Sequence, residues 1–543
     1  MDDKLHKIPH ANLDALHRIF TVPESSESTL SKIEQQISQN LMGFLKEHIV
    51  STAVNPSSLE RDFVSTTIDE DPVFVSDQAE FLLNKVVARS VHTSSPFFIG
   101  HMTSAVPYFM LPLAKIMMAL NQNLVKIETS KAFTPLERQT IGMLHRLVYN
   151  KSQSYYDTMT QNHRFALGAF CSDGTLANIT SLWVALNRLL QPQGDFGGVG
   201  QEGLPAALEF YNLSGLAILV SKRGHYSLSK AANVLGLGTK NLISVDTDEN
   251  QKIDLEKLKA KVADLQARRV GIVAIIGVAG STETGSVDPL EAMASICRDN
   301  NIHFHVDAAW GGPTLFSASY GYLLKGIEHA DSVIVDAHKQ LYVPVGAAVA
   351  LFKSEASLNL VKHHAEYIIR KGSRDLGKTT LEGSRPGTAM LVHSALRIMG
   401  RKGLELLIDL GIEKAKTFAR MIQEHDDFEL ITKPELNLLT YRFAPKALRD
   451  QLATSSATRR EDLQSLFSRL TVRIQKDQRE SGQTFVSRTA LSIPKYGDIR
   501  LHVFRVVLAN PLTTEDILRQ VLEEQKTLGY SLLEQEPYLR PTV

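Results

Sequence analysis

The chain has 543 residues, 43% hydrophobic and 22% charged, so it is long enough for several domains and lies in the ordinary globular range. Its 59 lysines and arginines balance 59 aspartates and glutamates, which excludes a global basic field for nucleic acid or anionic membranes. Two cysteines, Cys171 and Cys297, are too few for a disulfide framework and favour a reducing cytosol.

The start of the chain and its apolar segments predict a cytoplasmic enzyme. Met1–Lys4 lacks the cationic and apolar regions of a secretory signal. The longest apolar stretch, Tyr108–Leu120, is interrupted by Lys115 and is too short to cross a bilayer. We therefore expect no membrane partner and no nucleic-acid partner.

Three regions of different patterning follow one another. Helical patterns over Ser31–Ile49 and Gln78–Ser90 predict an N-terminal helical segment, 1–105. From residue 165 to 353, short β-branched runs alternate with helical segments, which predicts a large α/β domain, 106–400, with a mostly parallel sheet. Its expected strands are Ala217–Val220, Leu242–Val245, Ile272–Gly277, Ile302–Val306, Ser332–Val335 and Ala347–Phe352.

The C-terminal part is predicted to form a small α+β domain, 401–543. Gly387–Gly400 predicts a long helix that leads out of the large domain. The strand-like runs that follow are Leu436–Phe443, Thr484–Leu491 and Arg500–Leu508, and Thr514–Leu528 predicts a helix.

An acid and an amine follow two neighbouring predicted strands. Asp307 comes directly after Ile302–Val306, and Lys339 comes shortly after Ser332–Val335, 32 positions later, about one strand–helix–strand crossover. Carboxyl ends of parallel strands share one ligand crevice. A pyridoxal phosphate (PLP) site needs such a pair, a lysine that holds the aldehyde as a Schiff base and a carboxylate that keeps the pyridine nitrogen protonated.

A turn of small residues, Cys171–Asn178, opens the helical stretch Ile179–Leu190. Helix N-termini bind anions, so Gly174 and Thr175 are candidates for holding a phosphate. The alternative is a plain N-cap by Ser172 or Asp173. The nearby lysine motif favours the phosphate.

Two further segments follow strands. His225, after Ala217–Val220, could stack on a cofactor ring, or be an ordinary loop histidine. Ala279–Gly285 could hydrogen-bond that ring, or be a simple Ser/Thr turn. Sequence pattern alone leaves both alternatives open.

Two patterns are interpreted as decoys. Gly198–Gly203 matches GxGxxG, but a helix precedes it where a dinucleotide site needs a strand, so we predict a flexible surface loop and no NAD. Several histidines have spacings that suggest a metal but lie in polar stretches, which predicts solvated positions and no metal: His6, His10, His17, His363 and His364.

With these residues in place, the chain from about 92 to 511 resembles the group II PLP-dependent amino-acid decarboxylases, which include the glutamate, aromatic amino-acid and 2,4-diaminobutyrate enzymes. His305–Gly312 is nearly a signature of that family, and Ala337–Lys339 carries its His-Lys pair. Phe504–Pro511 resembles its Phe-Arg…Asn-Pro strand. The resemblance implies an aspartate-aminotransferase-like PLP fold.

The resemblance also implies roles for single residues. Lys339 would form the Schiff base, Asp307 would pair with the pyridinium nitrogen, and His225 would stack on the ring. Thr282 would lie near the polar edge of the ring and Ala309 on the face opposite His225. The phosphate would be held by Gly174, Thr175 and His338.

Other implied roles concern the substrate and a second subunit. Arg505 would bind the substrate α-carboxylate, and its alternative is a surface ion pair. Phe97 would wall the substrate pocket, with Asn121 nearby. Ser384 would reach the phosphate of the neighbouring subunit, which implies a homodimer with its active sites at the interface.

The chain departs from the family at two places. Asp173 stands beside the expected phosphate, so we expect it to cap the helix and point away. The segment Tyr367–Thr380 takes the place of the mobile catalytic loop, whose proton-donating tyrosine in animal relatives has no counterpart in 370–377. Tyr367 lies earlier, so the proton donor is open.

The expected reaction is α-decarboxylation of an acidic L-amino acid. Asp336–Pro344 and Leu381–Gly387 look most like bacterial aspartate 1-decarboxylases that make β-alanine for pantothenate, so L-aspartate is the expected substrate. The alternatives are L-glutamate, giving GABA, and 2,4-diaminobutyrate. A Schiff-base lysine alone also allows an aminotransferase or a desulfurase, and a non-catalytic PLP-fold protein is a third class.

Overall fold

A seven-stranded sheet forms the centre of the large domain in the computed structural model, which describes residues 29–46, 50–53, 56–103, 105–364, 372–497 and 499–535. Its spatial order is β1 (Gly168–Cys171), β7 (Ala348–Phe352), β6 (Ser332–Asp336), β5 (Phe304–Asp307), β4 (Val270–Val278), β2 (Gly215–Ser221) and β3 (Leu242–Val245). The strands from β6 to β3 pair in parallel, whereas β7 is antiparallel to both of its neighbours. The predicted mostly parallel sheet is confirmed.

Helices cover both faces of this sheet, which explains why its strands are apolar runs rather than alternating ones. Side chains alternate along β2: Leu219 packs into the core with α6, α11 and α12, while Ile218 and Val220 pack with α8 and α10. The covering helices are α6 (Phe133–Tyr149), α7 (Gln153–Met159), α8 (Gly174–Leu189), α9 (Val199–Phe210), α10 (Tyr226–Val234), α11 (Leu255–Ala267) and α12 (Leu290–Asp299).

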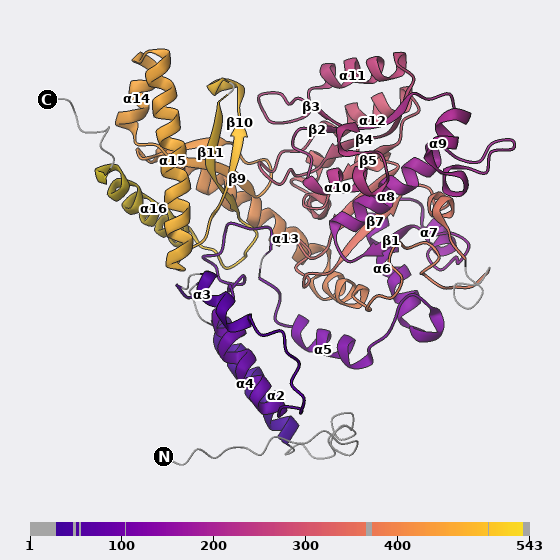
Figure 1. Cartoon of the computed structure of the whole chain (residues 1–543), viewed down its shortest axis with the longest axis horizontal. Coiled ribbons are helices and arrows are strands. Elements are labelled where there is room, and N and C mark those ends of the chain that lie inside the picture. Colours follow the sequence, from indigo (N-terminus) through magenta and orange to yellow (C-terminus); the bar gives the residue numbers. More distant parts are fainter. Residues whose placement is uncertain are drawn as a thin grey trace.

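A smaller four-stranded antiparallel sheet forms the C-terminal domain, as predicted (Figure 1). Its order is β10 (Ser487–Ser492), β11 (Arg500–Val507), β9 (Leu438–Phe443) and β8 (Phe428–Thr432). The helices around it are α14 (Lys446–Thr454), α15 (Ala457–Ser481) and α16 (Glu515–Gln535). α13 (Ala389–Glu424) joins the two domains and bends at Gly400, whose φ is 63°. The bend lies at the residue where the sequence pattern places a domain boundary, and that boundary stays a prediction.

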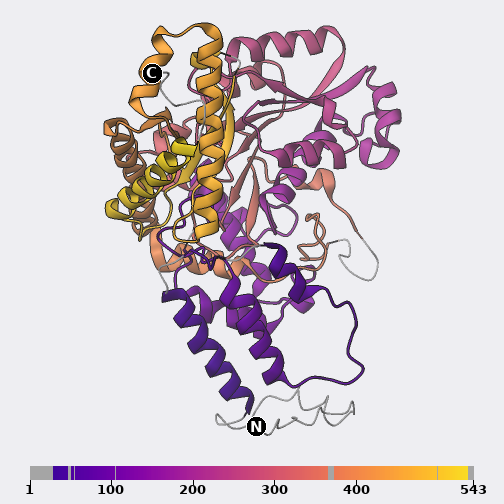
Figure 2. The same ribbon diagram turned by 60° about the vertical axis from the view of Figure 1, so that its left-hand side comes forward.

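The N-terminal helices project away from both domains (Figures 1 and 2). They are α2 (Thr29–Lys46), α3 (Pro56–Glu60) and α4 (Val75–Phe81), which continues as a π turn over Leu82–Val86. The chain then runs to the small domain, where Phe98 forms a bridge with Phe485. α5 (Met110–Leu120) follows, and among the described residues we find no helix both long and apolar enough to span a bilayer.

One prediction of local structure is wrong. The GxGxxG segment is not a loop, because α9 begins inside it, with Gly198 at φ 91° as its N-cap and a second break at Gly203, φ 81°. Glycine tolerates both positive φ angles, so the two glycines allow the start of α9 and the break within it. The element before it is α8, not a strand, so the segment lacks the context of a dinucleotide fingerprint.

We predict that His145 on α6 makes the stability of the fold depend on pH. Its Nε2 donates to the Phe352 carbonyl (3.0 Å) and its Nδ1 pairs with the Tyr156 hydroxyl (2.9 Å). Burial lowers the pKa of His145 to about 4, so between pH 6.5 and 4 the unfolded chain binds a proton that the folded chain does not. As the pH falls through this window, His145 therefore lowers the free energy of unfolding by about 1.4 kcal/mol per pH unit.

The His145→Gln variant keeps a donor for Phe352 but does not titrate. We expect it to be less stable than the native chain at pH 7.5, with a gap that narrows as the pH falls to 5. Urea unfolding at both pH values measures the two gaps. A gap that stays constant would contradict the assignment.

Candidate active site

A cavity of about 360 Å³ lies at the carboxyl ends of the parallel strands, where open α/β sheets bind ligands. Residues that follow β2, β4, β5 and β6 line it together with the first turn of α8. Arg505 reaches it from β11 of the small domain, and His101 and Met102 reach it from the N-terminal segment. Its volume is in the range of small-molecule sites.

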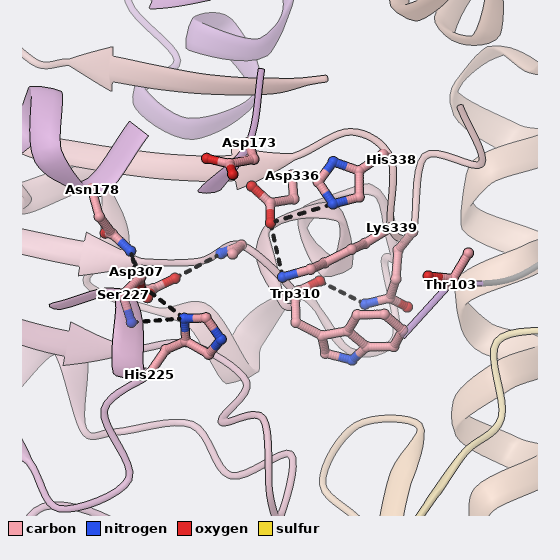
Figure 3. Close-up of polar contacts among 12 residues, drawn as sticks. Thr103, Asp173, Asn178, His225, Ser227, Asp307, Trp310, Asp336, His338 and Lys339 are labelled. Carbon is pink, nitrogen blue, oxygen red and sulfur yellow. Dashed lines mark hydrogen bonds and ion pairs between the residues drawn. The ribbon is translucent and has the colours of Figure 1, made fainter. Parts of the chain in front are cut away.

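Lys339 enters the cavity from the turn after β6 (Figure 3). Its Nζ lies 2.8 Å from Oδ2 of Asp336, the last residue of the strand. The other oxygen, Asp336 Oδ1, is buried and has no hydrogen-bond partner among the described residues. His338 donates from Nδ1 to the Ala347 carbonyl (2.9 Å), which leaves Nε2 facing Asp336 at 3.9 Å. A buried acceptor beside an amine is prepared for a polar ligand.

Asp307 ends β5, the parallel neighbour of β6, so its carboxylate opens into the same cavity as Lys339. Its Oδ2 accepts a hydrogen bond from Asn178 Nδ2 (3.2 Å), and its Oδ1 accepts one from the Ala309 amide (3.2 Å). Both donors keep the carboxylate fixed. The predicted acid and amine therefore meet in space.

His225 is the N-cap of α10 and lines the cavity. The Ser227 amide donates to its Nδ1 (3.3 Å), so the proton of the neutral ring lies on Nε2. Burial lowers the pKa of His225, against the opposing effect of Asp307. The imidazole is therefore neutral near pH 7 and is available as an apolar face.

The first turn of α8 forms the end of the cavity near Asp336. Asp173 caps the helix by accepting from the Leu176 amide (2.8 Å), as predicted, but the expectation that it points away is wrong, because it also lines the cavity. Gly174 and Thr175 line the cavity, and a Cβ on Gly174 would lie 2.7 Å from the Asp336 oxygens. Only glycine allows this close approach, and the N–H groups of the turn suit an anion.

Arg505 is buried and held by three acceptors. Its Nε donates to the Thr282 carbonyl (2.5 Å), and its Nη1 donates to the Gly100 carbonyl and to Ser487 Oγ (3.1 Å each). Nη2 has no protein hydrogen bond within the described part of the chain. Burial lowers its pKa to about 10, so the guanidinium is charged at neutral pH, and one edge is free for a carboxylate.

Arg223 is a second buried guanidinium on the same cavity. Its Nη1 pairs with Glu283, which also acts on Arg505 by charge. Its Nε is buried without a hydrogen-bond partner among the described residues. Two guanidiniums thus share one carboxylate, which leaves an excess positive charge.

Most of the predicted site residues come together. Those that line the cavity are Gly174, Thr175, His225, Thr282, Asp307, Ala309, His338, Lys339 and Arg505. Phe97, Asn121 and Ser384 do not line the cavity of their own chain. The Phe97 carbonyl accepts from Phe485, Asn121 ends α5 with φ 44°, and Ser384 Oγ accepts from Asn123 Nδ2 (2.9 Å). Their roles stay predictions.

Sequence reasoning assigned no site role to several lining residues, among them Asp336, Asn178, Arg223 and His101. Asp336 and Asn178 stand inside the two motifs it singled out, Arg223 precedes His225 by two positions, and His101 follows the loop expected to wall the pocket. The sequence feature that could have identified these residues is their position inside or next to those motifs. Tyr367 and the histidines His6, His10 and His17 lie outside the described residues, and within the described ones we find no cluster of three or more potential metal ligands.

Several known proteins similar to this chain in sequence or in fold are decarboxylases. Residues 76–444 match the family described as the pyridoxal-dependent decarboxylase conserved domain. Aspartate 1-decarboxylase of Aliivibrio fischeri is 55% identical over 526 residues, 97% of this chain and 96% of that protein. Human cysteine sulfinic acid decarboxylase is 28% identical over 82% of this chain and 85% of that protein. The crystal structure of the mouse cysteine sulfinic acid decarboxylase, at 24% identity, superposes with a TM-score of 0.78 and covers 91% of this chain and 98% of that chain.

The residues in the cavity fit PLP. Lys339 would supply the amine for its aldehyde, Asp307 a fixed carboxylate for its ring nitrogen, and the first turn of α8 a set of N–H donors for its phosphate. The neutral face of His225 suits an aromatic ring.

We predict that the Lys339→Ala variant loses the visible absorbance of the bound cofactor and all measurable turnover. The native chain, purified with PLP, should absorb in the visible range through a Schiff base with Lys339. Lys339 carries the one primary amine among the described residues that line the cavity. The exposed Lys325→Ala variant serves as the control and should keep both signals. Substantial turnover of Lys339→Ala would overturn the assignment.

Proposed function

The chain belongs to the pyridoxal-dependent decarboxylases, and we propose that it removes the α-carboxylate of L-aspartate to give β-alanine and CO₂. The observation that carries the choice of substrate is the pair of buried guanidiniums, Arg223 and Arg505, on the cavity that contains Lys339. An amino acid with two carboxylates matches two arginines. The 55% identical relative carries the same activity in its name.

Each residue then has a physical task. Arg505 binds the α-carboxylate through its free edge, and because three acceptors hold the guanidinium, it fixes the direction of the bond that breaks. Lys339 would hold the cofactor through its amine, and the Asp307 carboxylate would face the ring nitrogen. When bound, the cofactor would supply the electron sink for the electron pair left by CO₂.

Arg223 would bind the side-chain carboxylate. Its guanidinium lines the cavity and has only the partly exposed Glu283 as an ion-pair partner among the described residues, so it would attract a substrate carboxylate. The ammonium of 2,4-diaminobutyrate would instead face two cations, which disfavours that substrate. L-glutamate has the right charge but one more methylene, a difference worth about 1–3 kcal/mol in a fitted pocket. An aminotransferase or desulfurase on this fold would release no stoichiometric CO₂ from aspartate.

We also propose that the enzyme is a cytoplasmic homodimer. Both cysteines are free and buried, which suits a reducing compartment. The N-terminal arm and α5 expose a series of large apolar side chains that a second copy would cover. They include Phe63, Val64, Ile68, Phe74, Phe81, Leu82, Leu111, Ile116, Met118 and Leu120. In such a dimer Ser384, Phe97 and Asn121 would complete the partner's site.

The substrate proposal predicts a specific effect of Arg223→Gln. Loss of a charge-assisted hydrogen bond to the side chain should raise the KM for L-aspartate by roughly 10- to 100-fold with little change in kcat, because the lost contact is not with the reacting bond. Assays of CO₂ release with L-aspartate, L-glutamate, cysteine sulfinate and 2,4-diaminobutyrate measure the preference. Arg268→Gln, at an exposed ion pair, is the control.

Two outcomes would overturn this proposal. A native preference for 2,4-diaminobutyrate would refute the acidic substrate. An unchanged KM for aspartate in Arg223→Gln would refute the role of Arg223, while leaving decarboxylation itself intact.

The dimer proposal predicts a sedimentation mass of about twice 60.2 kDa for the native chain. Met118→Asp places a charge in the apolar surface of α5 and should shift the protein towards monomers and lower its activity. Tyr322→Asp, similarly exposed but in the large domain, should sediment like the native chain. A monomeric native chain with full activity would refute the shared site.

A further inference from the structure

We propose that Asn178 and His305 are positioning residues for Asp307, and that the Asn178 amide couples Asp307 to His225. The inference requires only that the site holds PLP and does not depend on the substrate. It comes from a chain of hydrogen bonds that begins at the Asp307 carboxylate and runs into the core between β5, β6 and α8. Figure 3 shows its first part.

The chain of hydrogen bonds is continuous and buried. Asn178 Nδ2 donates to Asp307 Oδ2 (3.2 Å), and Asn178 Oδ1 pairs with His305 Nε2 (2.9 Å). His305 Nδ1 pairs with Ser332 Oγ (2.8 Å), which also pairs with His303 Nε2 (2.9 Å). Asn178, His305 and Ser332 are each no more than 1% exposed. Water therefore cannot replace a missing partner without a cost in free energy.

The chemistry of the groups fixes the direction of every bond. A carboxylate only accepts, so the Asn178 NH₂ must face Asp307, and Asn178 Oδ1 must accept the His305 Nε2 proton. Burial lowers the pKa of His305 to about 4, so its Nδ1 carries no proton at neutral pH and accepts from the Ser332 hydroxyl. Ser332 Oγ then accepts from His303 Nε2. No rotated amide or other tautomer satisfies the same set.

Asn178 is a branch point. Its second N–H donates to Ser227 Oγ (3.1 Å), so the Ser227 hydroxyl is free to donate to His225 Nδ1 (2.8 Å). The Asn178 amide thereby holds the Asp307 carboxylate, which would face the ring nitrogen. Through Ser227 it also fixes the tautomer of His225, which would lie on the face of the ring. Without it, Asp307 Oδ2 has no protein donor within the described chain, and the Ala309 amide alone does not stop the carboxylate from turning.

The competing interpretation is a structural one, in which the network only stabilises the core. That role would lower the thermal stability of the cofactor-free protein and leave cofactor affinity unchanged. If the network positions Asp307, loss of the Asn178 hydrogen bond also weakens cofactor binding, because the Asp307 carboxylate is no longer held in line with the ring nitrogen. The two interpretations therefore separate on a measurement made without substrate.

The first test compares Asn178→Ala with Asn187→Ala. Asn187 lies on the same helix, is also buried, and donates only to the Trp183 carbonyl four residues earlier. We expect Asn178→Ala to weaken PLP binding to the apoenzyme by roughly 10- to 100-fold, to alter the visible spectrum of the bound cofactor, and to lower kcat more than it raises KM. Asn187→Ala should match the native chain in PLP affinity and spectrum. Equal PLP affinity and spectra in both variants would overturn the proposal, whatever their melting temperatures.

The second test asks whether His305 acts through Asn178, and it also serves if Asn178→Ala does not fold. His305→Gln keeps an N–H donor that can replace the Nε2 proton, whereas His305→Leu removes that donor at similar size. We expect His305→Gln to retain PLP affinity and spectrum within about threefold of the native chain and His305→Leu to resemble Asn178→Ala. Identical PLP affinities in the two His305 variants would overturn the role of His305.

Discussion

The parallel pairing of β5 with β6 is the constraint on which the site depends. Because the two strands run side by side in the same direction, Asp307 and Asp336 end at one edge of the sheet, and the turn after β6 brings Lys339 back over that edge. The apolar side chains of both strands are buried by helices on two faces, so a slip by one residue would move each side chain to the opposite packed face and disrupt its contacts. The position of the reactive amine relative to the acid is therefore a property of the sheet.

The acidic and the basic groups that line the cavity differ in how far their charges are compensated by protein partners. Each lining carboxylate has at least one partner: Asp173 caps α8, Asp307 accepts two N–H groups, and Asp336 pairs with Lys339 through one of its oxygens. The guanidiniums of Arg223 and Arg505 share a single, partly exposed glutamate. Burial of a charge without full compensation is costly, so it is retained where a ligand completes the pairing. The incomplete pairing of these two guanidiniums is the physical basis of the proposed acidic substrate.

Sequence patterns predict what depends on local periodicity and fail where contacts are distant. The runs around Asp307 and Lys339 are apolar over the length of a strand, and strand-end chemistry then follows from topology. The glycines of the GxGxxG segment suggest a flexible loop, whereas positive φ angles at Gly198 and Gly203 open and bend a helix. Asn178 gives no signal of its role, since its partners His305 and Asp307 are more than 120 positions away. Such partners become visible only in three dimensions.

Arg505 links the two domains and the N-terminal segment at the cavity. Its guanidinium donates to Thr282 of the large domain, to Gly100 of the N-terminal segment and to Ser487 of the small sheet, so it joins three parts of the chain before any substrate arrives. A long side chain that is already held loses little further rotamer freedom when it binds a carboxylate, and more of the binding energy remains for orienting the substrate. The bridge of Phe98 with Phe485 keeps Gly100 within reach. The small domain and the N-terminal segment therefore help to hold one guanidinium in place at the edge of the large sheet.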